Sequence, residues 1–221
     1  MDQISKKIKM ISEKLKELKN KFNLHEIDGY VVPKNDEYFS EFAKKDKLKT
    51  ITGFDGSFGL AIILKKKNFL FVDGRYVEQA KIQAGKKFKI LEIPKQLPYQ
   101  ILNSRLNLGF DPTVFTYRNL LYYFRNRVKL TPITKTIINS NISNNHTSKF
   151  YSLNPKVVGE TVNSKIKRLI QILKKDRSDY IFISAPENVA WLLNIRGRDN
   201  PFSPIPNCRT IINTKLWEIS C

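Results

Sequence analysis

Short apolar stretches alternate with amphipathic stretches along the chain, and this alternation restricts the possible folds more than any other feature. Short apolar runs that end at Gly, Pro or Asp predict buried strands. The predicted strands cover residues 30–32, 58–64, 69–72, 88–93, 106–110 and a segment leading into 131–132. Predicted helices alternate with them at residues 4–22, 36–43, 75–84, 99–103 and 117–127. A Lys-rich turn at 65–68 also predicts one hairpin, so we expect an α/β domain with a mixed sheet.

The first predicted helix has a single apolar face. Its apolar residues recur at spacings of three and four, with lysines between them: Ile4, Ile8, Ile11, Leu15, Leu18 and Phe22. A helix of this kind can form a coiled coil, lie on a membrane surface or pack within its own domain. Of these arrangements, we expect packing against the sheet of its own domain.

A polar stretch at 139–154, rich in Asn and Ser, is the best candidate for a linker. After it the opening pattern of the chain recurs. A Lys-rich amphipathic helix at 162–174 leads into a predicted strand at 180–184, just as the first helix leads into the first strand. Two such openings indicate a duplicated domain, of which we expect the second copy to be truncated.

The predicted organisation therefore has three parts. They are a first domain at 1–138, a linker at 139–159 and a partial second domain at 160–221. Two further strands, at 209–213 and 215–219, would leave the second sheet with an unfinished edge. We therefore expect the second domain to be markedly less stable than the first.

Composition limits the class of protein. The chain has 39 Lys and Arg against 20 Asp and Glu, a formal charge of +19 over 221 residues. The lysines are scattered, and no Arg-rich tract, zinc-finger spacing or RNA-binding aromatic motif accompanies them, so we do not expect a nucleic-acid partner. The longest near-apolar run, 58–64, is too short to cross a membrane, and no signal-peptide core is present. Cys208 and Cys221 form no disulfide framework, which suits a cytoplasmic protein.

Residues that could carry chemistry are few. The two histidines, His25 and His146, lack metal-ligand spacing, and we interpret both as surface residues. The glycines of Gly53-x-x-Gly56-x-x-Gly59 superficially resemble a phosphate loop, but a strand follows them where a phosphate loop needs a helix. Cys208 has no histidine near it in the sequence and is interpreted as an inert thiol. We therefore expect neither catalytic residues nor metal ligands in this chain.

Four segments carry more specific patterns. They are Asp28–Pro33 with Asp36–Tyr38; Ile51–Gly59; Phe71–Tyr76 with Gln79 and Ala80; and Asn188–Gly197 with Asp199 and Pro201–Pro204. In this order and spacing they resemble the N-terminal portion of the three-domain Xaa-Pro aminopeptidases, or aminopeptidase P, of the creatinase/prolidase superfamily. The resemblance covers nearly the whole chain and is weakest in the linker.

The resemblance implies a three-layer creatinase-like domain with a mixed sheet, followed by part of a second copy. It also implies that catalysis belongs to a further domain, in which two Asp, one His and two Glu hold two metal ions, usually manganese. None of these ligands maps onto this chain, so we expect no cofactor here and no activity from the chain alone. The implied partners are a second copy of the chain, forming a homodimer, or a separate catalytic-domain polypeptide.

The matching segments also suggest roles for individual residues. We expect structural turns at Gly53, Asp55, Gly56, Asp73 and Gly74, in which the aspartates bond nearby backbone N–H groups and Arg75 pairs with one of them. The candidates for a substrate cleft or an interface are Arg196, Asp199 and Arg75. The alternative for Arg196 and Asp199 is an ion pair within their own loop. Trp191 and Leu192 are predicted to be core residues.

Three functional hypotheses follow. The first is a non-catalytic N-terminal fragment of an Xaa-Pro aminopeptidase that contributes to dimerisation and to access to the cleft. The second is a stand-alone protein-interaction module. The third is a basic nucleic-acid binder, for which affinity would fall steeply with salt. We favour them in that order.

Overall fold

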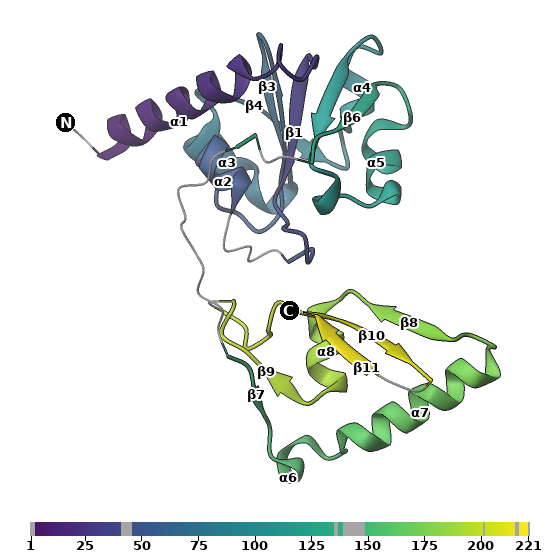
Figure 1. Ribbon diagram of the computed structural model, residues 1–221. Helices are drawn as coiled ribbons and strands as arrows, with labels where there is room; N and C mark the ends of the chain where they lie inside the picture. Colours follow the sequence, from purple (N-terminus) through teal and green to yellow (C-terminus); the bar gives the residue numbers. More distant parts are fainter. Residues whose placement is uncertain are drawn as a thin grey trace. The chain divides into compact units, whose positions relative to one another are not determined.

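The computed structural model describes residues 3–40, 46–134, 137–138, 149–200, 202–214 and 217–220. The chain forms two compact units, Met1–Ile142 (unit 1) and Ser143–Cys221 (unit 2) (Figure 1). Neither the sheets nor the apolar clusters of the described residues are shared between the two units.

Unit 1 is built on a six-stranded sheet with the order β4-β3-β2-β1-β5-β6. Its strands are β1 (Gly29–Pro33), β2 (Leu60–Leu64), β3 (Asn68–Asp73), β4 (Lys89–Ile93), β5 (Asn107–Phe110) and β6 (Lys129–Pro132). Only β2 runs antiparallel to its neighbours, and the other adjacent strands pair in parallel. The prediction of an α/β fold with a mixed sheet and one hairpin is confirmed.

Helices cover both faces of this sheet, which gives three layers (Figure 1). The helices are α1 (Gln3–Asn20), α2 (Lys47–Thr52), α3 (Val77–Ala84), α4 (Pro98–Ile101) and α5 (Tyr117–Phe124), with short 3-10 turns at Gly74–Tyr76 and Pro112–Val114. Buried residues of α1, α2 and α3 share one cluster with one face of the sheet. Residues from the segment that carries α4 and α5 pack in a second cluster on the opposite face.

The first helix behaves as its pattern predicts. Ile11, Leu15 and Leu18 of α1 are buried in one cluster with Ile63 and Val72 of the sheet. The apolar face of α1 is therefore occupied within unit 1, which confirms packing on its own domain.

The segment after β1 differs from prediction. Of the helix expected at 36–43, residues 36–40 form turns, and the rest lies outside the described residues. The Asp36 carboxylate accepts hydrogen bonds from the backbone N–H groups of Tyr38 and Ser40, which favours a turn over a helix. Sequence analysis missed the short helix α2, which begins at the N-cap Asp46 and ends at Gly53.

Unit 2 repeats the opening order on a smaller scale. Its strands are β7 (Tyr151–Ser152), β8 (Tyr180–Ile183), β9 (Ile195–Arg196), β10 (Arg209–Asn213) and β11 (Trp217–Ser220), and its helices are α6 (Pro155–Val158), α7 (Val162–Lys175) and α8 (Pro186–Leu192). Strands β11, β10 and β8 form a three-stranded sheet, and β7 pairs with β9. Part of the segment expected as a linker thus contains a strand and a helix, while 139–148 lie outside the described residues.

None of the helices in the described part of the chain combines the length and the hydropathy needed to cross a bilayer.

Candidate functional site

The sheet of unit 1 brings three of the four distinctive segments to one edge. Pro33 at the end of β1 pairs with Leu60 at the start of β2, and Leu60 pairs with Phe71 near the end of β3. Strand β5 ends at the same edge, where Phe110 pairs with Val31. The ends of parallel strands in an open α/β sheet are the usual place for a functional site.

A hollow of about 290 Å³ lies at this edge. Its lining comes from all three segments and from the segment that carries α5. It includes Lys34, Asn35, Ser57, Phe58, Arg75, Phe115, Asn119 and Tyr123. Segments separated by some forty residues in the sequence therefore form one surface. We call this hollow and its rim the edge site.

Arg75 is held firmly at the edge site. Its Nε and Nη2 atoms donate to the two carboxylate oxygens of Asp73 at 3.2 and 2.7 Å, and its backbone N–H donates to Asp73 at 2.9 Å. The guanidinium also lies 5.2 Å from the centre of the Tyr76 ring, and the Tyr76 hydroxyl lies 2.9 Å from Ser57 Oγ. The Arg75 side chain remains 74% exposed. The hydrogen bonds from Arg75 hold the pKa of Asp73 below its usual value, so the pair stays charged.

The turn at Gly53–Gly59, which we call the glycine turn, lines the edge site through Ser57, Phe58 and Gly59. Gly53 has φ +78°, a left-handed conformation that ends α2 and that other residues adopt only with strain. A Cβ on Gly56 would lie 2.3 Å from Cζ of the buried Phe54 ring, so only glycine fits there without displacing the ring. Glycine is therefore favoured at position 53 by the backbone conformation and at position 56 by the lack of space for a side chain.

Asp55 has different partners from those predicted. Its carboxylate accepts hydrogen bonds from the side-chain amides of Gln79 and Gln83, both at 2.8 Å, and Lys49 Nζ lies 3.6 Å away. The Gln83 hydrogen bond is the largest cause that lowers the pKa of Asp55 below its usual value. Asp55 thus ties the glycine turn to helix α3 through side chains, where we expected bonds to nearby backbone N–H groups.

Two lysine–aspartate pairs, missed by sequence analysis, fix α2 beside the edge site. Lys34, just after β1, pairs with Asp46, and both side chains are largely buried. Lys47 Nζ donates to Asp111 Oδ2 at 2.8 Å, and Thr113 donates to Asp111 Oδ1 through its backbone N–H and its hydroxyl. Burial would raise the pKa of Asp111, but the bonds from Lys47 and Thr113 outweigh it and hold the pKa below 3.8. The only sign of these pairs in the sequence was Asp111-Pro112, which directly follows the strand predicted at 106–110.

This arrangement predicts an acid-dependent contribution of the Lys47–Asp111 pair to stability. The folded pKa of Asp111 is depressed, so its contribution is present above about pH 3.8 and is lost as the pH falls through the folded pKa. We expect Lys47→Met to lower the free energy of unfolding of unit 1 by roughly 1–2 kcal/mol at pH 7. That difference should shrink below about pH 4. Urea unfolding followed by circular dichroism at both pH values checks this. An equal difference at pH 3 and pH 7 would refute it.

The candidates in unit 2 have separate partners. Arg196 Nη1 donates to the carbonyl oxygens of Ile195 at 2.8 Å and Ala190 at 3.3 Å. Asp199 Oδ2 accepts a hydrogen bond from the Asn207 backbone N–H at 2.9 Å. These bonds organise the loop around each residue and do not join Arg196 to Asp199.

The prediction that Trp191 is a core residue is wrong. Its side chain is 56% exposed, whereas its neighbour Leu192 is buried as predicted. Trp191 lies on the outer side of α8, where Lys165 Nζ sits 4.2 Å from its ring centre and also donates to Asn194 Oδ1. An ammonium group over the ring thus takes the place of apolar packing.

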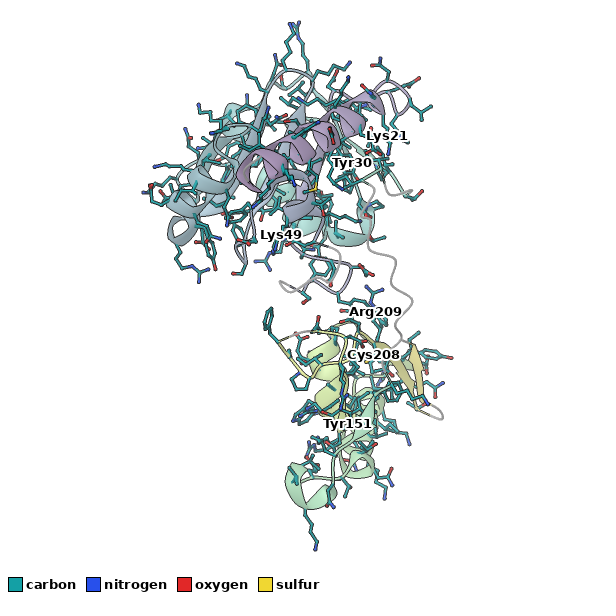
Figure 2. All side chains as sticks on the ribbon, turned by 90° about the vertical axis from the view of Figure 1, so that its left-hand side faces the viewer. Lys21, Tyr30, Lys49, Tyr151, Cys208 and Arg209 are labelled. Carbon is teal, nitrogen blue, oxygen red and sulfur yellow. The ribbon has the colours of Figure 1, made fainter. Side chains whose placement is uncertain are left out.

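The remaining candidates show no catalytic grouping. Cys208 is fully buried within the apolar cluster of unit 2 (Figure 2). His25 lies in the turn after α1, and His146 is outside the described residues. Within the described ranges, no three or more His, Cys, Asp or Glu side chains come together in a way that could hold a metal ion. The described residues therefore do not fit a metal centre.

The amino-acid sequence is similar to known proteins along most of its length. Two family profiles, each described as the creatinase/prolidase N-terminal domain, match residues 14–139 and 142–219. A protein of Laccaria bicolor named probable Xaa-Pro aminopeptidase P is 30% identical over 211 residues, which cover 88% of this chain and 33% of that protein. Xaa-Pro aminopeptidase 1 of Dictyostelium discoideum is 27% identical, over 88% of this chain and 35% of its own length.

A solved structure shares the fold. The X-prolyl aminopeptidase of Caenorhabditis elegans, described as a cytosolic enzyme with a di-nuclear active site, matches with a TM-score of 0.84 at 22% identity. The match covers 95% of this chain and 38% of that one. The chain therefore spans about a third of the length of the curated relatives that it matches.

Proposed function

The chain belongs to the creatinase/prolidase N-terminal domain family, and we propose that it acts as a non-catalytic N-terminal part of an Xaa-Pro aminopeptidase. In this role the edge site of unit 1 contributes to dimerisation and to access to the catalytic cleft. Metal-dependent hydrolysis before proline, with two manganese ions, belongs in this proposal to a catalytic domain outside these 221 residues. We place this assembly in the cytoplasm, as the description of the Caenorhabditis elegans enzyme suggests.

One observation supports the edge site as the interface. Three sequence segments converge on one hollow, and its rim carries a guanidinium that is both exposed and held in place. An arginine fixed in this way loses little side-chain entropy on binding, and it can donate to a carboxylate or a carbonyl oxygen of a partner. Arginines are also enriched among the residues that dominate protein interfaces.

A charge reversal tests this role. We expect Arg75→Glu to weaken self-association of the full chain at least tenfold, about 1.4 kcal/mol. Sedimentation velocity over a concentration series measures the dissociation constant. Arg105→Glu is the matched control, because Arg105 is also an exposed arginine of unit 1 but does not line the hollow. A chain that remains monomeric at all concentrations would contradict the proposal, as would equal effects of the two reversals.

Residues Arg196 and Asp199 have a secondary place in this proposal. Both lie in the fourth distinctive segment, and their hydrogen bonds to Ile195 and Asn207 involve backbone groups of their own region. We propose that they shape a loop of unit 2 near the cleft and do not contact substrate through an ion pair of their own.

A further inference from the structure

Helix α5 exposes one side to solvent. The exposed side chains of the helix and of its C-cap residue are Tyr117, Arg118, Leu121, Tyr122 and Arg125. The two tyrosines and the leucine are 75%, 46% and 40% exposed. Spacings of three and four residues place side chains next to one another on a helix, and Arg125 ends the helix one turn after Leu121. We call these five residues the α5 face.

The opposite side of α5 is occupied within unit 1. Phe124 is completely buried, and Leu120 and Tyr123 pack against the same apolar cluster on the sheet. The α5 face is therefore not needed to attach the helix to its own domain. Adjoining apolar residues that stay exposed in this way usually mark an interaction surface.

The residue types of the α5 face are those of a protein interface. Tyr and Arg are enriched among the residues that dominate binding between proteins, whereas Lys is depleted there. Lysines outnumber arginines in the chain as a whole, yet every basic residue from 96 to 128 is an arginine. The α5 face thus differs from the scattered lysines on the rest of the chain.

Aromatic contacts hold two of these side chains in place. The guanidinium of Arg125 lies 4.4 Å from the centre of the Tyr99 ring. The Tyr122 ring stacks edge-to-face on Tyr123, with ring centres 5.2 Å apart. A partner would therefore meet side chains that have already lost part of their conformational freedom, which lowers the entropic cost of binding.

The charge of the α5 face is positive. The only acidic residue from 96 to 128 is Asp111, which is buried and accepts a hydrogen bond from Lys47. Arg118 and Arg125 are both exposed, and a guanidinium binds a carboxylate through two parallel hydrogen bonds. Charge complementarity therefore specifies an acidic partner.

The order of the residues specifies the spacing of the partner's groups. Arg118 and Arg125 are seven residues apart, roughly 10.5 Å along a helix axis, and Leu121 and Tyr122 lie between them. A second helix laid along the α5 face matches this order with two carboxylates seven residues apart and an apolar side chain between them. Among the described helices of this chain, none carries two carboxylates at that spacing, so a second copy does not supply the pattern.

We propose that the α5 face is a docking site for an acidic amphipathic helix of another protein. Two carboxylates of that helix bind Arg118 and Arg125, and an apolar side chain between them packs on Leu121 and Tyr122. A protein fits better than a nucleic acid, because the scattered lysines can bind phosphates but offer no apolar contact between two arginines. The proposal goes beyond the role of Arg75 in dimerisation and does not depend on it.

The probe is a labelled synthetic peptide of about three heptads with the repeat Glu-Ala-Gln-Leu-Ala-Gln-Ala, which has the required spacing. A comparison peptide has the same composition, with its glutamates grouped at one end. Binding of each to the full chain is measured by fluorescence anisotropy at about 0.15 M salt, where scattered surface charges are largely screened. We expect the patterned peptide to bind at least tenfold more tightly than the comparison peptide.

Variants of the chain locate the site. We expect Arg118→Glu/Arg125→Glu to weaken binding of the patterned peptide at least tenfold. Lys66→Glu/Lys67→Glu is the matched control, because it changes the net charge equally at exposed residues of unit 1 outside the α5 face. It should bind within about twofold of the unchanged chain.

A second variant keeps the test decisive if the double arginine variant does not fold. Leu121→Ala retains both arginines and favours the helix, and we expect it to weaken binding of the patterned peptide at least threefold. Equal affinity for the two peptides, or equal effects of the two double variants, would overturn the proposal.

Two further outcomes would replace the proposed occupant. Oligouridine that binds more tightly than the patterned peptide, and that the arginine variant no longer binds, would overturn the proposal in favour of RNA. Self-association of the chain alone that the arginine variant abolishes would overturn it in favour of a second copy. The effect of Arg75→Glu on dimerisation is measured separately, so the two proposals can fail independently.

Discussion

Replacing Phe71 by alanine should lower the free energy of unfolding of unit 1 by about 3–5 kcal/mol. Phe71 lies on β3, a strand with neighbours on both sides, and its side chain is completely buried in the cluster that also contains Phe110 and Phe124. Truncation removes a full aromatic side chain and leaves a cavity that strands on both sides prevent from closing. Because a domain is stable by only about 5–15 kcal/mol, this loss is a large fraction of the total.

The two units can be observed separately in this experiment. Both tryptophans, Trp191 and Trp217, lie in unit 2, so tryptophan fluorescence reports the unfolding of unit 2. Circular dichroism reports both units. We expect Phe71→Ala to shift the unfolding of unit 1, seen by circular dichroism, to lower urea concentration. The transition of unit 2, seen by fluorescence, should stay at the same urea concentration.

The matched control is Phe182→Ala. Phe182 is also a phenylalanine of a sheet strand, β8, but more than half of its side chain is exposed, so little packing is lost. We expect a change within about 0.5 kcal/mol, as for surface substitutions elsewhere. A loss from Phe182→Ala as large as that from Phe71→Ala would show that this face of β8 is covered within the chain itself.

Hydrogen exchange should reveal a large difference in stability between the two units. Unit 1 has two apolar clusters, one on each side of a six-stranded sheet. Among its described residues, unit 2 has one small cluster, on one side of a three-stranded sheet. We expect the slowest amides of β8 and β10 to exchange at least a hundredfold faster than those of β1 and β2, about 2.7 kcal/mol less in opening free energy.

The comparison has an internal reference, because strands β1 and β2 occupy the same positions in the repeat as β8 and β10. Intrinsic exchange rates of the two sequences are corrected before the strands are compared. Equal protection in the two sets of strands would contradict the account, since it would mean that unit 2 is as fully packed as unit 1.

The sequence was sufficient to predict most elements of regular structure. The helical pattern is strong where one face is buried, as in α1, and continuous apolar runs mark the largely buried strands of the β2–β3 hairpin. These elements were predicted within a few residues. Helix α2 was missed because it is short and its first turn is capped by one hydrogen bond, which the Asp46 carboxylate accepts from the Lys49 backbone N–H. The turns at 36–40 were mistaken for a helix because the bonds to the Asp36 carboxylate are invisible in a pattern of apolar residues.

The edge site was only partly predictable. The distinctive segments could be identified from their residues, but their convergence depends on the strand order β3-β2-β1-β5, which no local pattern encodes. Lys47 and Asp111 are 64 residues apart, and their pairing could not be inferred without that order. Trp191 was assigned to the core because large aromatic residues usually are, whereas here a lysine covers its ring.

The measurement that tests the central claim most directly is the rate at which the full chain hydrolyses an Xaa-Pro peptide in the presence of Mn²⁺. It is made with the chain alone and with the part of the Laccaria bicolor relative that follows the matched region. If the chain is the non-catalytic N-terminal part of such an enzyme, it alone will give the same rate as buffer with Mn²⁺. Added to the relative's part, it will raise the rate above that of the part alone. Hydrolysis by the chain alone, or no change on mixing, would contradict the account.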